Sequence, residues 1–543
     1  MERKYFERDL THIRSTPFGI HTDQAGYMPD ARKIAVIPFE CGVFEVTDGD
    51  GRICFTGKTC HHGYDAASGD DVYTADFSDL TAEGIYRVRA GGKTSPCFRI
   101  GKDVYCPVLK DMLKAFWYLR CGCGLDEEHA GEYAHGICHT SDAVLWEDRS
   151  VSLDVTGGWH DAGDYGRYVT AGACAAAHLL YAYRMYPQVF DGLVAGIPHQ
   201  DMPDILTECR YELEWLMKMQ AEDGGAYHKV TTAMHAPFVM PEDDREQLYV
   251  FPVSSMATAD LAAVCALASG IYRAYDTAFA DRLFDTALRA CGWLKAHPEF
   301  VGFTNPEGVN TGSYGQRDDM SNRYWAWAEM YALTGDADWF AHMRSCDVML
   351  TGLGYAETGG LGSLAYILSP YANDEDMVTR IRTAFAERAA ELRELSAVSG
   401  YSVAMREHEY CWGSNMNVMK NGMILAIDAY LSGKAADDKV QGQLHYLLGR
   451  NALGISYVTG TGEFRCNYPH LRPAFADGVE ECIPGMVAGG PNRRPADPYA
   501  VSVIPEGTPP MRCYADDTAS YSLNEITIYW NSPAVFVTAA ICS

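Results

Sequence analysis

"ATADLAAVCALASGIYRAYD", residues 257–276, decides the fold class of most of this chain. Its larger apolar residues recur every three or four positions, so that Leu261, Val264, Ala268 and Ile271 share one face of a helix. Alanines make the other faces apolar too, and a helix that is apolar on several sides is expected in the interior of a large fold. The stretch therefore predicts a buried helix in a helical domain.

Ten further segments after about residue 104 have a helical pattern. In "DILTECRYELEWLMKMQ", Asp204 is the expected N-cap, and Ile205 and Cys209 continue one apolar stripe. The others start near residues 108, 171, 278, 322, 338, 376, 414, 437 and 531. Loops as long as those that join them, at 223–253, 299–320 and 452–524, are more often functional than idle. Eleven helices with such loops favour a ring of paired helices that presents its loops at one end.

Residues from about 16 to 100 have the pattern of short strands instead. The runs "KIAVIP", "VFEVTD", "ICFTGK", "VYTADFS" and "GIYRVRA" are β-branched or aromatic, and turn signals such as "DGDGR" separate them. About seven such runs predict a small β-sandwich, which we interpret as a structural module because it contains no catalytic-looking cluster. We place the domain boundary between residues 1–103 and 104–543.

The charge balance excludes some classes of partner. The chain has 44 Lys and Arg against 72 Asp and Glu, a net charge of −28. A nucleic-acid-binding protein needs a basic face, and an acidic surface is not attracted to an anionic membrane. The sequence also has no run of 18 apolar residues. We therefore expect neither nucleic acid nor a membrane among the partners.

The cysteines and the first residues indicate a compartment. The start, "MERKYFERDLTHIRS", has no apolar run typical of a secretory signal. The 18 cysteines form no repeating framework, which favours reduced thiols buried as small apolar residues. We expect a cytoplasmic protein, or a secreted one if a leader is missing from this sequence, that is a monomer or a weak homo-oligomer.

Two aspartates three residues apart stand out in "GGWHDAGDYGRYV", residues 157–169. The glycines around Asp161 and Asp164 leave the backbone free to turn tightly. Two carboxylates this close need donors, a shared proton or an ordered water. A pair that orients and deprotonates one water would be a general-base site. The alternative is that Asp164 caps the helix that follows.

Two later stretches contain further candidates. "YADDTASYSLNEITIYWNSP" contains Asp516 and Glu525, and burial of Glu525 against aromatic residues would keep it protonated, as a general acid requires. The alternative is a glutamate that stabilises a helix N-terminus. In "YPHLRP", His470 and Arg472 could bind substrate hydroxyls, or His470 could be a structural histidine.

A metal site is also indicated. "RCGCG" supplies Cys121 and Cys123, "GICH" supplies Cys138 and His139, and His160 follows 21 residues later. Thiolates and imidazoles suit tetrahedral zinc, and a complete shell of two Cys and two His would make that zinc structural. Buried free cysteines are the alternative.

Together these residues resemble glycoside hydrolase family 9, the inverting cellulases and related β-glucan hydrolases. "GGWHDAGDYGRYV" resembles its catalytic-base motif, "HYLLGRNALGISYVTGTGE" with "YPHLRP" its histidine motif, and "DDTASYSLNEITIYWNSPAV" its Asp/Glu motif. "YCWGSNMNVMKNGMIL" matches a recurrent stretch. The resemblance implies an all-α (α/α)6 barrel over 104–543, with a twelfth helix, preceded by a small all-β immunoglobulin-like sandwich.

The resemblance also implies residue roles. Asp164 matches the general base, Asp161 its partner in holding the attacking water, and Glu525 the general acid. The residues that match substrate-binding positions are His470, Arg472, Asp516 and Trp530. The residues that match a structural zinc site are Cys121, Cys138, His139 and His160, with Cys123 left over.

The sequence departs from the family pattern at two points. Leu471 stands in the middle of what is commonly His-His-Arg. Many members have an acidic pair for calcium just before the helix that reads "RYWAWAEMYALTGD" here, whereas this chain has Ser321 and Asn322. Calcium is the second candidate cofactor, with Asp318 and Asp319 nearby.

We therefore expect inverting hydrolysis of β-1,4-glucosidic bonds in cellulose-derived or mixed-linkage β-glucans and cellodextrins, with endoglucanase-like action. An exo-acting β-glucosidase or exo-β-glucosaminidase on short oligosaccharides is the alternative. Two other classes stay open, a catalytically silent carbohydrate-binding protein and a zinc-dependent hydrolase. The first is disfavoured because base, acid and His-x-Arg are all present.

Overall fold

The chain divides by its contacts into two units. The structure is a computed structural model that describes residues 17–198 and 200–543. One unit combines the residues up to Ala115 with Ala389–Ser543, and the other is Phe116–Arg388. The boundary placed between residues 103 and 104 stays a prediction. The start of the chain, in which no export signal is expected, lies outside the described residues.

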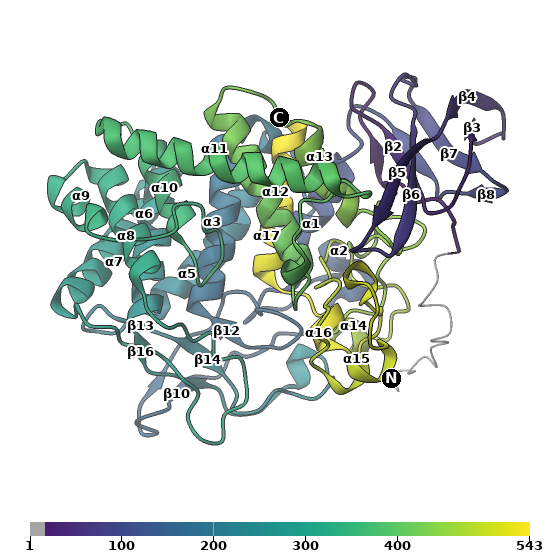
Figure 1. Ribbon diagram of the computed structural model, residues 1–543. Helices are drawn as coiled ribbons and strands as arrows, with labels where there is room; N and C mark the ends of the chain where they lie inside the picture. The colour runs from purple at the N-terminus through teal and green to yellow at the C-terminus, as the bar shows by residue number, and fades with distance from the viewer. Residues whose placement is uncertain (1–16, 199) are drawn as a thin grey trace. The chain divides into compact units, whose positions relative to one another are not determined.

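The predicted strands form two sheets in the first unit (Figure 1). The larger sheet has the order β1-β9-β7-β3-β4, with β8 paired to β7, and the smaller has the order β2-β6-β5. Their bounds are β1 (Gly26–Tyr27), β2 (Ile34–Ile37), β3 (Val43–Asp48), β4 (Ile53–Lys58), β5 (Cys60–Asp65), β6 (Asp70–Asp76), β7 (Gly84–Ala90), β8 (Lys93–Thr94) and β9 (Phe98–Ile100). Alternate residues of β7, Tyr86, Val88 and Ala90, are buried, as a strand with one face on a core requires.

This β-module is fastened to the C-terminal part of the same unit by buried polar contacts. The Asp23 carboxylate lies 2.7 Å from Nδ1 of His445. Arg512 donates to Asp70, and the Tyr401 hydroxyl donates to the same carboxylate. Contacts between residues more than 300 positions apart explain why the module and the C-terminal segment form one unit.

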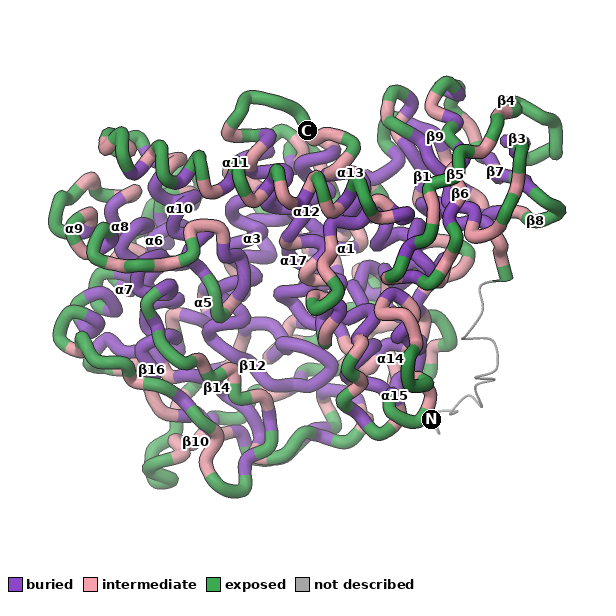
Figure 2. Tube along the Cα trace, in the orientation of Figure 1, coloured by how far each residue is buried: buried purple, intermediate pink, exposed green. Residues whose placement is uncertain are grey.

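In the second unit, α3, α6, α8 and α10 pack side by side in that order, and α5, α7 and α9 pack on α3, α6 and α8 respectively. Their bounds are α3 (Val169–Met185), α5 (Asp204–Lys218), α6 (Ser255–Tyr272), α7 (Thr277–Ala296), α8 (Met320–Thr334), α9 (Ala337–Arg344) and α10 (Gly359–Ile367). Helix α6, which contains most of the stretch quoted first, is buried along nearly its whole length (Figure 2). Of the described residues, this is the helix long and apolar enough to cross a membrane, and 89% of it is buried inside the fold. A buried core helix and a membrane span share this composition.

The remaining long helices are α1 (Cys106–Tyr118), α11 (Glu375–Val398), α12 (Ser414–Leu431), α13 (Asp438–Leu447) and α17 (Ile528–Cys542). In the described part of the chain, helices of eight or more residues thus number twelve, and the one missed from sequence is α10. Its segment "GGLGSLAYI" has three glycines, which lower helix propensity. Tertiary packing overrides that preference, because a side chain at Gly362 would collide with Tyr324 of α8.

Short strands and helices lie in the segments between the long helices. One small sheet has the order β11-β10-β15-β14-β12, and β13 pairs with β16. Their bounds are β10 (Ala143–Leu145), β11 (Ser152–Leu153), β12 (Arg167–Tyr168), β13 (Ala226–Tyr227), β14 (Lys229–Thr231), β15 (Tyr249–Val250) and β16 (Val253–Ser254). The short helices are α2 (Glu127–Ala130), α4 (Pro187–Phe190), α14 (Arg472–Ala476), α15 (Pro498–Val503) and α16 (Tyr521–Asn524).

Asp204 was expected to cap α5, which was wrong: Pro203 is the N-cap and Asp204 is the first helical residue.

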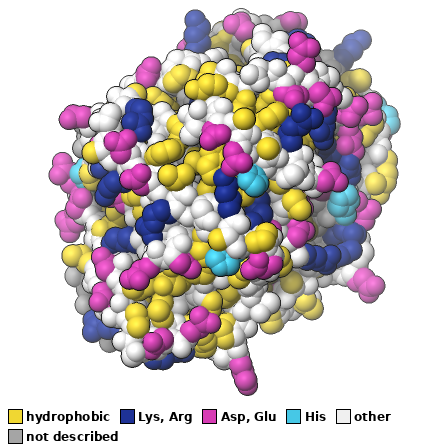
Figure 3. Space-filling model, turned by 90° about the vertical axis from the view of Figure 1, so that its left-hand side faces the viewer, with side chains coloured by type: hydrophobic (Ala, Val, Ile, Leu, Met, Phe, Trp, Pro, Cys, Tyr) yellow, Lys and Arg dark blue, Asp and Glu magenta, His cyan; other side chains and the backbone are white. Residues whose placement is uncertain are grey.

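Charged side chains of both signs are interspersed with apolar ones on the face that Figure 3 presents. A mixed surface of this kind is usual for a globular protein.

Candidate active site

The predicted base motif forms a tight loop, residues 157–168, directly before α3. Gly158 has a φ of 77°, and a side chain there would collide with the Trp215 ring, so this position requires glycine. An antiparallel bridge joins Arg120 to Trp159 and fixes the start of the loop. The backbone of the residues that follow, which include Asp161 and Asp164, is thereby held in a fixed position.

Asp164 is surrounded by hydrogen-bond donors. Its Oδ2 accepts from the Gly166 N–H at 3.2 Å and the Tyr168 hydroxyl at 3.1 Å, and His235 Nδ1 lies 3.3 Å away. These groups favour the ionised carboxylate, as a general base requires. Tyr168 is the N-cap of α3, so the alternative that Asp164 caps this helix is wrong.

Asp161 is buried beside it with a different set of contacts. The Tyr314 hydroxyl donates to Oδ2, whereas Oδ1 is buried and has no partner within the described chain. Burial, followed by the charge of Asp164, raises the pKa of Asp161 well above its usual range. A negative charge is therefore more stable on Asp164 than on Asp161. Such a pair can hold a water and remove its proton.

Two side chains at these carboxylates were missed from sequence, His235 and Tyr314. They lie in the loops 223–253 and 299–320, whose length was the available signal. Tyr314 has a φ of 46°, a left-handed conformation that is rare for a non-glycine residue and often marks a functional position.

Two buried glutamates of α5 hold the loop from the other side. The indole N–H of Trp159 donates to Glu208 at 2.7 Å, and its backbone N–H donates to Glu212 at 2.7 Å. Arg120 pairs with Glu208 at 2.8 Å. Burial raises the pKa of Glu212 to about 8.

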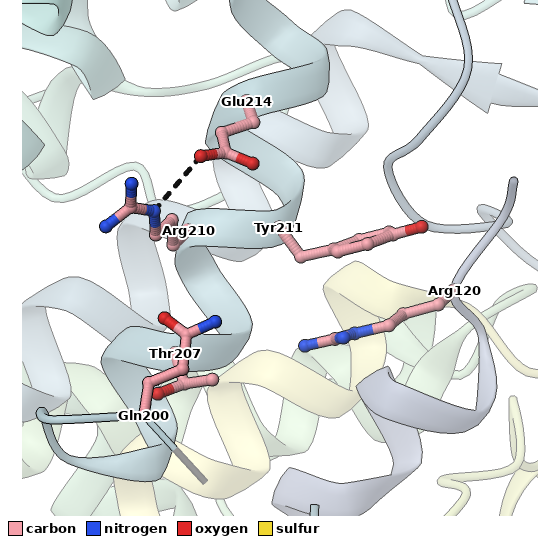
Figure 4. A pocket seen from close by; sticks show the side chains of 6 residues that line it. All are labelled: Arg120, Gln200, Thr207, Arg210, Tyr211 and Glu214. Carbon is pink, nitrogen blue, oxygen red and sulfur yellow. Dashed lines mark hydrogen bonds and ion pairs between the residues drawn. The ribbon is translucent and has the colours of Figure 1, made fainter. Parts of the chain in front are cut away.

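A pocket of about 340 Å³ lies beside α5 (Figure 4). Its lining residues are Arg120, Gln200, Thr207, Arg210, Tyr211 and Glu214. The guanidinium of Arg210 pairs with Glu214 at 3.0 Å, and that of Arg120 with Glu208. None of the predicted site residues lines this pocket, so we do not assign the substrate to it.

Glu525 belongs to the other unit and lies between α16 and α17. Its backbone forms a parallel bridge with His470, and its carbonyl accepts the Gly489 N–H at 2.8 Å. Thr527 is the N-cap of α17 and the first turn of that helix has no acidic residue. Glu525 is therefore not part of the helix N-terminus that the alternative required.

Asp516 fixes the backbone next to Glu525. Its carboxylate accepts the N–H groups of Asn467 at 2.8 Å and Tyr468 at 2.9 Å, and the side-chain amide of Asn524 at 2.9 Å. Burial raises the pKa of Asp516 although these donors oppose the shift. Asp516 thus connects the segment before His470 to the residue before the predicted acid.

His470 is oriented by two hydrogen bonds. Its Nδ1 lies 2.6 Å from the Thr518 carbonyl, so Nδ1 carries a proton and donates to that oxygen. Its backbone N–H donates to the Asn524 carbonyl at 2.8 Å. Arg472 begins α14 and is 6% exposed.

The aromatic residues of this unit differ in exposure. Trp530 is 3% exposed and its ring packs on Gly413 and Gly489, so its role at the sugar stays a prediction. Trp412 is 44% exposed, and its ring lies 5.2 Å from that of Tyr521. Trp412 belongs to the recurrent stretch "YCWGSN" and was not among the predicted site residues.

The four predicted metal ligands, Cys121, Cys138, His139 and His160, come together. They are buried, and their ligand atoms all lie within 4.8 Å of one another. The Cys121 N–H donates to the Gly158 carbonyl and the His160 N–H to the Leu119 carbonyl, both at 2.7 Å, so pairing of two chain segments brings these two ligands together.

The imidazoles of this group fit a bound cation. His139 Nδ1 and His160 Nε2 are buried and lack a hydrogen-bond partner among residues 17–198 and 200–543. The other nitrogen of His139 lies 3.2 Å from Asp244, and a carboxylate behind a histidine ligand fixes the ring toward the metal. The group can therefore hold a metal ion, and Asp244 supports it, which was not predicted.

The acidic residues before α8 have protein partners. Asp319 pairs with Arg323 at 2.9 Å, and the amide of Asn322 donates to Asp260 at 2.8 Å. Asp318 accepts the Met320 N–H at 3.1 Å. Calcium at this point stays a prediction.

Glycoside hydrolases use carboxyl groups of this kind as base and acid, and the comparisons with known proteins assign the chain to that class. Residues 105–538 match the model of glycosyl hydrolase family 9, and residues 16–95 match that of the cellulase N-terminal ig-like domain. The chain belongs to glycosyl hydrolase family 9.

Similar proteins agree with this assignment. A cellodextrinase from Butyrivibrio fibrisolvens is 45% identical, over 96% of this chain and 98% of its own length. A single mutant of a thermostable endoglucanase from Alicyclobacillus acidocaldarius superposes with a TM-score of 0.92 at 35% identity, over 97% of this chain and 100% of that one. A zinc-binding triple mutant of the family 9 endoglucanase J30 superposes with a TM-score of 0.90 at 35% identity, over 95% of this chain and 99% of that one. The predicted fold class, a barrel of helices preceded by an immunoglobulin-like sandwich, is confirmed, and the exo-acting alternatives are not favoured.

Proposed function

We propose that this enzyme hydrolyses β-1,4-glucosidic bonds of cellodextrins and related β-glucans with inversion, through Asp161, Asp164 and Glu525. The observation that carries these roles is the unequal setting of the two aspartates, one held by several donors and one with a raised pKa and a buried oxygen without a partner. Membership of the family and the similarity to a cellodextrinase support the substrate class.

In this mechanism Asp161 and Asp164 hold one water. Asp161 Oδ1 is the oxygen available to orient it, and Asp164 takes its proton as the water oxygen bonds to the anomeric carbon. Tyr168 and Gly166 keep Asp164 ionised before that transfer.

Glu525 supplies the proton that the leaving group needs. It begins protonated and donates to the glycosidic oxygen as the bond to the anomeric carbon breaks. Asp164 then carries a proton and Glu525 a charge, and exchange with solvent restores both. Inversion requires the two carboxyl groups to stand roughly 6.5–9.5 Å apart, so that water and sugar fit between them.

We assign substrate binding to His470, Arg472, Trp412 and Tyr521. The imidazole of His470 can form a hydrogen bond to a sugar hydroxyl, and the exposed ring of Trp412 suits the apolar face of a sugar. Asp516 would act by holding the backbone beside Glu525, and Trp530 by packing on Gly413 and Gly489.

Zinc is the proposed metal of Cys121, Cys138, His139 and His160, because two thiolates and two imidazoles suit its tetrahedral geometry. A bound zinc would cross-link the three chain segments that supply these ligands and would fix His160, the residue before Asp161. A closed shell of four protein ligands leaves no position for substrate, so its role is structural.

The compartment we propose is the cytoplasm, where the substrate would be an imported cellodextrin. All 18 cysteines lie in the described part of the chain and none of them forms a disulfide there, which suits a reducing compartment. We propose a monomer or a weak homo-oligomer.

Product analysis on cellotetraose tests the proposal. Nuclear magnetic resonance of early products should show the α-anomer first, as inversion requires. Asp164→Ala should lower kcat by about 10³-fold or more with the fold intact. Asp281→Asn, a change at an exposed residue of α7, is the matched control. A β-anomer, or an Asp164→Ala variant of near wild-type rate, would exclude the proposed roles.

A further inference from the structure

Lys229 is a buried cation that the mechanism above does not use. Its side chain is fully buried in β14, which pairs with β12 so that Lys229 lies opposite Tyr168. Burial lowers the pKa of Lys229 to about 7, and the charge of Asp164 acts in the opposite direction. A buried lysine is costly, so its retention calls for a specific use.

All three donors of Lys229 are directed to the loop 299–320. The ammonium donates to Oδ1 of Asn305 at 2.8 Å, to Oγ1 of Thr311 at 2.9 Å and to the carbonyl of Gly312 at 2.7 Å. The ring of Phe251 lies 4.6 Å from Nζ. The geometry is that of an anchor for this loop, with the charge enclosed by acceptors and an aromatic face.

His228, the residue before Lys229, holds the same loop at Ser313, the residue after Gly312. Its Nε2 lies 2.8 Å from the Ser313 carbonyl, and its Nδ1 lies 2.8 Å from the Ser254 hydroxyl. Burial lowers the pKa of His228 to about 3, so the ring is neutral. Nε2 then carries the proton that reaches Ser313.

The anchored part of the loop lies next to the residues that connect it to the catalytic aspartates. The Gly312 N–H donates at 3.0 Å to the Tyr168 hydroxyl, which donates to Asp164. Tyr314, two residues later, is held in its left-handed conformation and donates to Asp161. The loop thus contacts Asp161 directly through Tyr314 and reaches Asp164 through Tyr168. Lys229 and His228 hold this loop immediately before Tyr314.

We propose that Lys229 is a positioning residue of this enzyme, which sets the hydrogen bonds of Tyr314 and Tyr168 to the water-binding pair Asp161 and Asp164. The inference rests on the proposed function of those aspartates. Loss of the anchor would let Tyr314 relax toward an ordinary backbone conformation, and a misplacement of about 1 Å near the reacting groups can cost 10²-fold in rate.

A double-mutant cycle with Lys229→Met and Tyr314→Phe tests the proposal, with kcat and KM measured on cellotetraose. Lys229→Met should lower kcat by roughly 10²-fold while KM changes by less than about threefold. If Lys229 acts through Tyr314, the double variant should be no slower than the slower single variant.

Lys33→Met is the matched control. Lys33 is fully buried in the β-module and donates to the carbonyls of Pro29 at 2.6 Å and Ala31 at 2.8 Å. Its loss should lower the melting temperature and leave kcat unchanged, which separates loss of a buried lysine from loss of positioning.

Multiplicative effects of Lys229→Met and Tyr314→Phe, or an unchanged kcat in Lys229→Met, would overturn the proposal. If Lys229→Met does not fold by circular dichroism, Thr311→Val removes one acceptor of the ammonium, and it should lower kcat without adding to Tyr314→Phe. An unchanged kcat in that variant overturns the proposal as well. An active Asp164→Ala variant would instead remove the proposed function, so the two failures are distinguishable.

Discussion

The two carboxylate regions are supported by different means. We call residues 157–168 the base segment and residues 516–525 the acid segment. In the base segment, side chains from distant parts of its unit, among them Tyr314 and His235, reach the carboxylates themselves. In the acid segment one buried carboxylate, Asp516, collects donors and fixes the backbone beside Glu525. The contrast indicates that the base needs control of its charge, whereas the acid needs a fixed position.

The sharpest test of this contrast removes each catalytic carboxyl and replaces its chemistry. Glu525→Ala should lose about 10³-fold in kcat on cellotetraose and retain activity on dinitrophenyl cellobioside, whose leaving group needs no proton. Asp164→Ala should be slow on both substrates and be partly restored by azide, a nucleophile that needs no base. Release of dinitrophenol measures the rate of each variant on the dinitrophenyl substrate, with and without azide. Rescue of Glu525→Ala by azide would reverse the assignment of acid and base.

Loss of Asp516 should cost more stability than loss of any single contact in the base segment. Asp516→Ala leaves two backbone N–H groups and the Asn524 amide without their acceptor. Buried donors left unsatisfied cost about 1–3 kcal/mol each, so we expect a large fall in melting temperature and a fall in kcat. Asp517→Ala, next in the chain, is the control, because Asp517 accepts one N–H, that of Ala519. Equal effects of the two changes would refute a special role for Asp516.

Loss of Asp244 should weaken metal binding before it affects chemistry. Asp244→Asn removes the charge behind His139, and changes at such positions typically cost 10–100-fold in metal affinity. Competition with a chromophoric chelator measures that affinity directly. Asp243→Asn is the neighbouring control. Unchanged zinc affinity in Asp244→Asn would show that the contact does not orient the ligand.

How much of this could be predicted from sequence depended on local pattern. The paired aspartates, the Glu525 motif and the four Cys and His ligands lie in short quoted stretches, and the structure brings the metal ligands together as predicted. Helix α10 was missed because its glycines serve packing on α8, which no local pattern records.

The supporting residues were beyond sequence for a related reason. His235, Tyr314 and Lys229 lie in loops or a short strand without periodicity, and each matters through a contact far along the chain. Even the Asp204 cap failed in this way, because its carboxylate accepts the Ala195 N–H instead of capping α5. Side-chain contacts between distant segments depend on the finished fold.

The smallest expected effect concerns Glu212, the buried carboxyl under the base segment. Its pKa is raised from 4.5 to about 8 by burial, so the folded protein holds a proton that the unfolded chain loses above pH 4.5. Its contribution to stability is therefore complete below about pH 4.5 and is lost as the pH rises through about 8, a loss on the order of 3–5 kcal/mol.

Glu212→Gln should remove this dependence. The amide oxygen can still accept the Trp159 N–H, and no charge has to be buried at high pH. The melting temperature of Glu212→Gln should therefore exceed that of the wild type at pH 8 and equal it at pH 5, and kcat should change little. The control is Glu214→Gln, a change on the same helix at a partly exposed residue, which should show no such gain. A gain of equal size at both pH values would mean that Glu212 is already ionised in the folded state, so that a charged carboxylate supports the base segment.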